Sequence, residues 1–137
     1  VIEGPYGRFD FGDAAEDQVW VAGGVGVAPF LARLEALASS DGARGDVHFF
    51  YCIKSFREAS FPGGLEALCR EARVNLHLHI DDRDGWMNPG EIGEFSRRAK
   101  SVWFCGPKAW AGKLRPALRR DHGLRPEQFH RELFEFR

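Results

Sequence analysis

Apolar and polar positions follow two different periods along this chain. Short apolar or alternating runs predict strands, which cover residues 19–22, 47–53, 74–80, 102–105 and 129–136. Apolar residues at helical spacing predict helices between them, over 28–38, 64–72, 91–99 and 108–120. Strands that alternate with helices form βαβ units, whose right-handed crossovers place helices on both faces of a parallel sheet. The sequence therefore predicts an α/β fold, a doubly wound five-stranded parallel sheet with order 3-2-1-4-5 and helices on both faces.

The first 17 residues do not follow this alternation. They read "EGPYGRF", a strand-like run, and then the polar stretch "DAAEDQ". We expect residues 1–17 to be the end of another unit plus a linker. Residues 18–137 are expected to form one α/β domain of a longer protein.

Three glycines lie within four positions between the first predicted strand and the first predicted helix. Gly23, Gly24 and Gly26 precede Pro29, which stands near the helix start, where its missing N–H costs nothing. Such a turn offers backbone N–H groups and the positive end of a helix dipole to a pyrophosphate. No Lys-Ser/Thr pair follows, so the turn is not a P-loop. A tight turn without a ligand is the alternative.

A second candidate turn, Phe104-Cys105-Gly106-Pro107, follows the fourth predicted strand. In a doubly wound sheet the first and fourth strands are neighbours at the point where ligands bind. We therefore expect this turn and the glycine turn to face each other across one crevice. A small buried thiol is the alternative interpretation of Cys105.

Composition limits the possible classes of function. The three cysteines form no CxxC pair, which favours a reducing compartment over a disulfide framework and predicts no metal site. The net charge of −1 gives no indication of nucleic-acid binding, and no apolar run predicts membrane insertion by this domain. Charge is uneven: residues 1–96 carry −8 and residues 97–137 carry +7. The basic part suits either phosphate or membrane attraction, or a solvated helix face.

Four motifs occur in a recognisable order: "EGPYG", "AGGVGVAPF", "FCGPK" and "FHRELFEFR". Together they resemble the NAD(P)-binding domain of the ferredoxin–NADP reductase superfamily. The "FYCIK" strand and the chain's ending are most similar to the bacterial ferric reductase and NADPH oxidase branch. The resemblance implies hydride transfer from NADPH or NADH to FAD, followed by single-electron transfer to haem, an iron–sulfur centre or ferric iron.

The resemblance also implies roles for individual residues. The pyrophosphate would be held by Gly23, Gly24, Gly26 and Pro29. The nicotinamide pocket would be lined by Cys105, Gly106 and Pro107. Cys105 and Glu132 would be the catalytic residues, with the Glu132 carboxylate near the reacting ring. Phe134 would cover the flavin, with packing at a sheet edge as the alternative.

The chain departs from the family pattern in one respect. The resemblance implies that residues 1–17 are the last strand of the family's FAD-binding β-barrel plus a linker. The Arg-x-Tyr-Ser/Thr segment with which that barrel binds flavin is absent. FAD would therefore be held mainly by a barrel outside this chain, and the isolated chain is expected to be inactive. The ferric reductase resemblance implies a membrane haem domain as partner and a cytoplasmic location, at the inner face of the inner membrane. A soluble reductase feeding an oxygenase through a ferredoxin, or a non-catalytic nucleotide sensor, are the alternatives.

Charged residues after the second and third strands bear on the choice of dinucleotide. Lys54, Ser55 and Arg57 could hold the 2′-phosphate of NADPH. Asp81 and Asp82 would instead favour the free ribose hydroxyl of NADH and repel a phosphate. Both cofactors remain open, with NADPH favoured by the basic residues.

Overall fold

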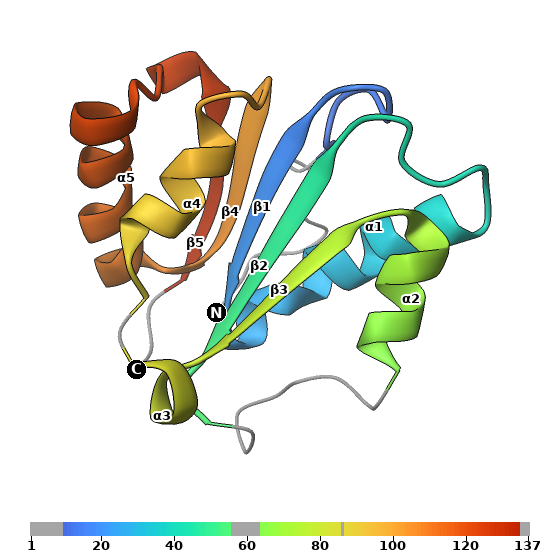
Figure 1. Ribbon diagram of the computed structural model, residues 1–137, viewed down its shortest axis with the longest axis horizontal. Coiled ribbons are helices and arrows are strands. Elements are labelled where there is room, and N and C mark those ends of the chain that lie inside the picture. The colour runs from blue at the N-terminus through green and yellow to red at the C-terminus, as the bar shows by residue number, and fades with distance from the viewer. Residues whose placement is uncertain (1–9, 56–63, 86, 135–137) are drawn as a thin grey trace.

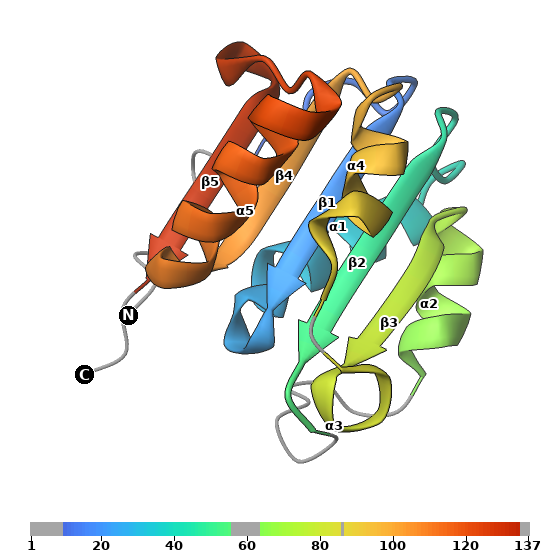
Figure 2. The same cartoon turned by 60° about the vertical axis from the view of Figure 1, so that its left-hand side comes forward.

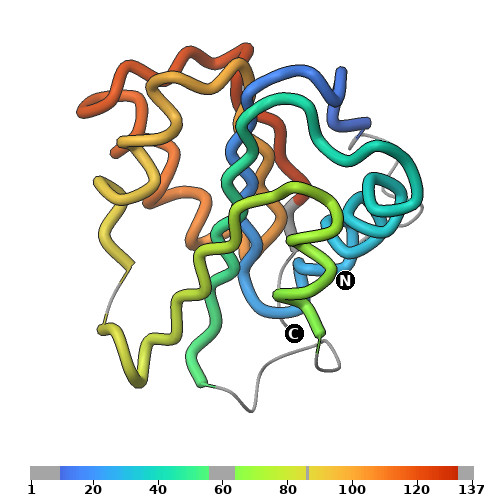
Figure 3. Tube along the Cα trace, turned by 45° about the vertical axis from the view of Figure 1, so that its right-hand side comes forward, coloured from blue at the N-terminus to red at the C-terminus, as the bar shows by residue number. Residues whose placement is uncertain are grey.

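The computed structural model describes residues 10–55, 64–85 and 87–134. It contains one all-parallel sheet in the order β3-β2-β1-β4-β5, as the sequence predicts (Figure 1). The strands are β1 (Gln18–Gly23), β2 (Val47–Ile53), β3 (Asn75–Ile80), β4 (Ser101–Pro107) and β5 (Phe129–Phe134). Because all strands run in one direction, their carboxyl ends share one edge of the sheet, where the chain turns after β1, β2 and β3 (Figure 3).

Helices cover both faces of this sheet, which confirms the predicted layers. One face packs against α1 (Ala28–Ala38) and α2 (Leu65–Ala72), and the other against α4 (Pro89–Ser96) and α5 (Lys108–His122) (Figure 2). Strand β1, which is buried along its whole length, shows why apolar runs form the central strands of the sheet. Trp20 belongs to the α1 side of the core, whereas Val19 and Val21 belong to the α5 side. Both faces of a central parallel strand need apolar side chains.

The segment before β1 packs onto the sheet through one aromatic side chain. Phe11 is buried, and its ring centroid lies 5.1 Å from that of Trp20 and 5.0 Å from that of Trp103. The Gln18 side chain donates a hydrogen bond to the Phe11 carbonyl. Residues 1–9, where the sequence predicts a barrel strand, lie outside the described residues. The assignment of residues 1–17 to a preceding domain thus stays a prediction.

Most element boundaries differ from the predicted ones by a few residues. Helix α4 begins at Pro89 because the Asn88 side chain accepts a hydrogen bond from the Gly90 N–H at 2.9 Å. Helix α5 extends to His122 and ends at Gly123, whose φ of +69° suits a residue without a side chain. The sequence did not predict the short helix α3 (Asp81–Asp84), nor the 3₁₀ turns η1 (Gly24–Val27) and η3 (Pro126–Gln128).

Candidate functional site

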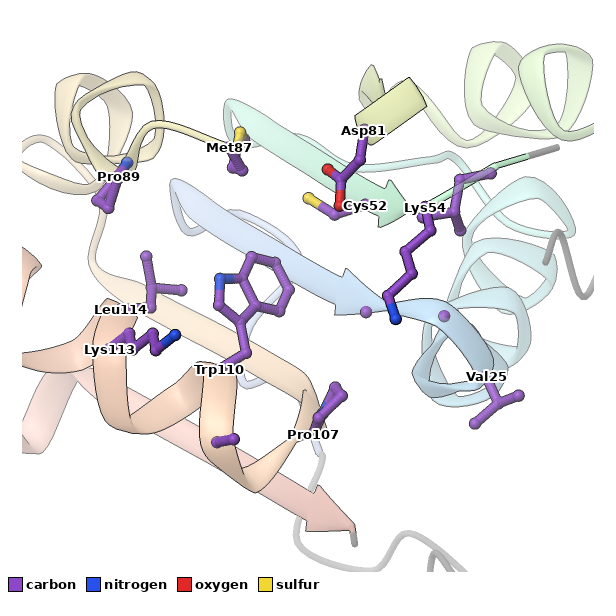
Figure 4. Close-up of a pocket in the computed structure, with 14 residues that line it drawn as sticks. Val25, Cys52, Lys54, Asp81, Met87, Pro89, Pro107, Trp110, Lys113 and Leu114 are labelled. Atoms are coloured by element: carbon purple, nitrogen blue, oxygen red, sulfur yellow. The ribbon is translucent and has the colours of Figure 1, made fainter. Parts of the chain in front are cut away.

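A cleft of about 820 Å³ opens at the carboxyl ends of β1 and β2, on the face covered by α4 and α5. Figure 4 shows its two side walls, one from the start of α4 and one from the first turns of α5. Five of the residues singled out in the sequence line it: Gly23, Gly24, Lys54, Asp81 and Pro107. The wall is completed mainly by apolar side chains, which include Cys52, Met87, Trp110 and Leu114.

The glycine turn forms one 3₁₀ turn that leads directly into α1, where Pro29 occupies the first helical turn. Gly24 has a φ of +55°, a left-handed conformation in which a side chain is strained. A Cβ built on Gly24 would meet no atom within 4 Å, so the space beside this backbone is open. An open backbone at the start of a helix fits a pyrophosphate, because its N–H groups and the helix dipole favour an anion.

The two predicted turns lie against each other, as expected from the neighbouring strands β1 and β4. A Cβ on Gly26 would overlap the backbone carbonyl of Cys105. A Cβ on Gly23 would lie 3.0 Å from the Pro107 ring and 3.1 Å from the Trp110 indole. Gly26 therefore serves packing between the turns, whereas Gly24 leaves open space.

We expect Gly26→Ala to destabilise the fold by about 1–3 kcal/mol, since the new methyl group must push β4 away from the turn. Gly112→Ala is the matched control, because Gly112 lies in α5 with no atom within 4 Å of its missing Cβ. That control should raise stability by about 0.5–1 kcal/mol through helix propensity. Thermal unfolding of the two variants measures both effects. Equal melting temperatures would contradict the close contact at Gly26.

The structure places Cys105 in the core rather than in the cleft. Its side chain is fully buried on the α1 side of the sheet, opposite to the cleft walls. Glu132 is its register partner on β5, and Phe134 pairs in the same way with Pro107. Burial, with a smaller contribution from Glu132, raises the pKa of the Cys105 thiol to about 12. The thiol is therefore neutral at physiological pH, which does not suit a nucleophile. The proposed contact with the nicotinamide stays a prediction, as does the catalytic role of Glu132.

All three cysteines should resist thiol reagents in the folded chain. Cys69 and Cys105 are free and lie in the core, whereas the free Cys52 is mostly buried but also lines the cleft. Burial is the main cause that raises the pKa of each thiol, so all three stay protonated and react slowly. The unfolded thiols ionise near pH 9 while the folded ones stay protonated, so stability should fall as the pH rises above 9. Titration with a chromogenic disulfide should find less than one reactive thiol in the native chain and three in denaturant. Fast native labelling would contradict this burial.

Two charged residues reach the cleft from the ends of β2 and β3. Lys54 directs its ammonium group toward the end of β1 and the turn that follows (Figure 4). Asp81 directs its carboxylate into the cleft, and an Oδ1 atom lies 3.3 Å from Nε2 of His79. Ser55 does not line the cleft, and Arg57 lies outside the described residues. The structure therefore places both Lys54 and Asp81 in the cleft wall. From the sequence they were alternative determinants of the preference for NADPH or NADH.

Comparison with known proteins identifies the arrangement. No protein-family model matches the chain. Over 133 residues it is 25% identical to a carnitine monooxygenase reductase subunit of Acinetobacter baumannii, covering 97% of this chain and 40% of that protein. Over 121 residues it is 33% identical to the ferredoxin–NAD(+) reductase component of an alkene monooxygenase system of Xanthobacter autotrophicus, covering 78% of this chain and 36% of that protein. Both relatives are named as reductase components or subunits of oxygenase systems, in agreement with the resemblance of the four motifs to the ferredoxin–NADP reductase superfamily.

The fold agrees with this assignment. The chain superposes on the FAD/NAD-binding domain of a Vibrio cholerae nitric oxide dioxygenase with a TM-score of 0.74 and 20% identity, covering 88% of this chain and 52% of that one. The chain thus spans about two fifths of the length of the curated relatives it matches and half of this structural neighbour. The chain thus shares the fold of part of that FAD/NAD-binding domain.

Several residues that line the cleft are not predicted as site residues from the sequence. The helical spacing of Trp110, Leu114 and Leu118 predicts one apolar helix face, and a packing role was the simplest interpretation. Only Leu118 is confined to the core, whereas Trp110 and Leu114 also line the cleft. Met87 had no sequence signal, because only the tertiary fold brings it opposite α5.

The described residues offer neither a metal site nor a membrane-spanning helix. No group of three or more His, Cys, Asp or Glu side chains there could hold a metal ion. Among the described helices, none has the length and apolar run needed to cross a membrane.

Proposed function

We propose that the chain is the NAD(P)H-binding domain of a flavin-dependent oxidoreductase. NAD(P)H supplies a hydride to FAD, and the flavin passes electrons singly to an iron-containing acceptor. The observation that carries the proposal is the open backbone at Gly24, which faces the cleft at the start of α1. Motif order and relatives that are named reductase components support it.

The residues of the glycine turn would bind the pyrophosphate. Its backbone N–H groups would donate hydrogen bonds to the phosphate oxygens, and the ammonium of Lys54, the residue after β2, would add a positive charge. Gly26 holds the turn against Cys105, so the donors are in place before the ligand arrives. The half of the dinucleotide on the other side of the pyrophosphate from the nicotinamide would then lie between the cleft walls.

The nicotinamide half would extend toward the tips of β4 and β5. There Cys105, Gly106 and Pro107 are paired in register with Glu132, Leu133 and Phe134. The neutral Cys105 thiol keeps charge away from the reacting ring, while Glu132 provides a partly buried carboxylate at the same edge. Orientation is the contribution of these residues, and the FAD is held mainly by a barrel outside this chain.

Two acceptors fit different observations. The sequence motifs favour the ferric reductase branch, with a haem domain in the membrane and a cytoplasmic location for this domain. The names of the relatives favour the reductase component of a monooxygenase system. The test is anaerobic mixing of the full-length protein with NAD(P)H, then with ferric chelate or ferredoxin. Flavin bleaching supports the proposal, and the faster reoxidant identifies the acceptor. Dinucleotide binding without bleaching would instead indicate a nucleotide sensor.

The position of Asp81 leads to a prediction about the dinucleotide. Its carboxylate faces the cleft, where it would repel the 2′-phosphate of NADPH, whereas Lys54 is directed at the turn. The expected cofactor preference therefore shifts from NADPH to NADH. We expect Asp81→Asn to raise the affinity for NADPH relative to NADH about tenfold, or about 1.4 kcal/mol. Asp82→Asn is the control, because Asp82 is exposed and does not line the cleft. Side-by-side calorimetric titrations with both dinucleotides measure the ratio. A wild-type preference for NADPH that Asp81→Asn leaves unchanged would contradict this assignment.

A further inference from the structure

We propose that Trp110 is the platform on which the adenine ring of the dinucleotide stacks. This inference rests on the proposed function, because it requires a dinucleotide in the cleft. It adds a positioning residue that neither the sequence motifs nor the comparisons assign. The argument depends on the orientation of the indole, its hydrogen bonding and the side of the sheet on which it lies.

The hydrogen bonding of Trp110 differs from that of the other described tryptophans. The indole N–H of Trp20 donates to Gln18 Oε1 at 2.9 Å, and that of Trp103 donates to Ser101 Oγ at 2.8 Å. Within residues 10–55, 64–85 and 87–134, the Trp110 N–H has no such partner. A tryptophan in the core satisfies its N–H, whereas one at a binding surface keeps it for water or a ligand.

The indole of Trp110 packs against Phe104 and Gly23 and also lines the cleft. Its ring centroid lies 5.2 Å from that of Phe104, at an interplanar angle of 62°. Its six-membered ring packs beside Gly23, where even a Cβ would lie only 3.1 Å away. In Figure 4 the other side faces the open cleft, with Met87 and Pro89 across from it. A fixed ring with one free side is suited to stacking, because little conformational entropy is lost on binding.

The side of the sheet determines which base Trp110 would contact. Cys105 points to the α1 side, while Trp110 and the cleft lie on the α5 side. The glycine turn, where the pyrophosphate would bind, lies between them at the end of β1. A dinucleotide anchored at that turn with its nicotinamide toward Cys105 must direct its adenosine into the cleft. The apolar wall of Met87 and Leu114 fits a flat aromatic base.

The test uses the 137-residue chain with ADP, NADH and reduced nicotinamide mononucleotide as probes in calorimetry. Stacking of a base on an aromatic side chain predicts that Trp110→Leu weakens ADP and NADH binding about tenfold or more. Trp110→Phe should retain most of that affinity, since it keeps an aromatic surface. The mononucleotide lacks adenine, so its affinity should not change. Arg119→Ala, an exposed position of the same helix outside the cleft, is the control and should match the wild type.

Tryptophan fluorescence gives a second measurement that does not need the leucine variant to fold. ADP should quench the wild-type emission and should quench Trp110→Phe much less. Equal ADP affinity in wild type and Trp110→Leu, or equal quenching in wild type and Trp110→Phe, would overturn the assignment of Trp110. In that case NADH still binds and the proposed function stands. If the wild-type chain binds neither NADH nor ADP, the proposed function itself fails.

Discussion

The chain alone, mixed with FAD and then desalted, should elute colourless and should not oxidise NAD(P)H at enzymatic rates. Only Glu132 and Phe134 are predicted to touch the flavin, and both belong to β5. One stacking contact contributes on the order of 1 kcal/mol. Micromolar binding requires roughly 8 kcal/mol. The proposal assigns the difference to a preceding barrel domain, because this sequence lacks the family's flavin-binding segment.

The visible absorbance spectrum of the desalted chain measures this directly. Dinucleotide binding by the same sample shows that the domain is folded, so a colourless result cannot be ascribed to unfolding. A stoichiometric yellow chain that oxidises NAD(P)H would mean that the flavin site lies within these 137 residues. It would also move Glu132 from a peripheral contact to the centre of the site.

The second large effect is expected at Gly24. Gly24→Ala would place a methyl group in the open space beside the turn, where the pyrophosphate should lie. Losing charge-assisted hydrogen bonds there costs about 1.5–3 kcal/mol. Calorimetric affinity for NADH should therefore fall by about tenfold to a hundredfold.

The variant also carries a backbone cost, which needs its own control. Gly24 and Gly123 both have positive φ, +55° and +69°, and neither has an atom within 4 Å of a built Cβ. Each alanine would have to adopt the left-handed conformation, which lowers the free energy of unfolding by a similar amount, about 1–2 kcal/mol. Gly123 ends α5 and does not line the cleft, so Gly123→Ala should melt at a similarly reduced temperature yet bind NADH normally. If both variants lose affinity alike, strain rather than phosphate contact explains the Gly24 effect.

The sequence predicts the sheet well because the decisive signals are local. A strand such as β1 is buried on both faces and therefore reads as an uninterrupted apolar run. Three glycines followed by Pro29 mark the turn and the start of α1 without any tertiary information. The meeting of Gly26 with Cys105 follows from the strand order, which the βαβ pattern already implies.

The cleft is less predictable because its walls come from distant segments. The spacing of Trp110 shows that it lies on an apolar helix face, but not that α4 leaves this part of the face uncovered. Lys54 and Asp81 both follow strands, so the sequence places them at one edge. The directions of their side chains, which decide between pyrophosphate and ribose contacts, depend on packing (Figure 4). Cys105 shows the same limit, since one residue of register determines the face of the sheet it joins.

The close approach of Gly26 to the Cys105 carbonyl also has a consequence for co-translational folding, because β1 and β4 leave the ribosome at different times. Strand β1 is made early and can pair with β2 as soon as that strand emerges, but its other neighbour, β4, begins only at Ser101. Until β4 docks, the glycine turn lacks the support of the Cys105 backbone, and the proposed anion site of a nascent chain is incomplete. If the glycine turn binds the dinucleotide as proposed, cofactor can stabilise only chains whose β4 has left the ribosome and paired with β1. Cellular NAD(P)H would thus protect finished domains and leave abortive fragments to proteolysis.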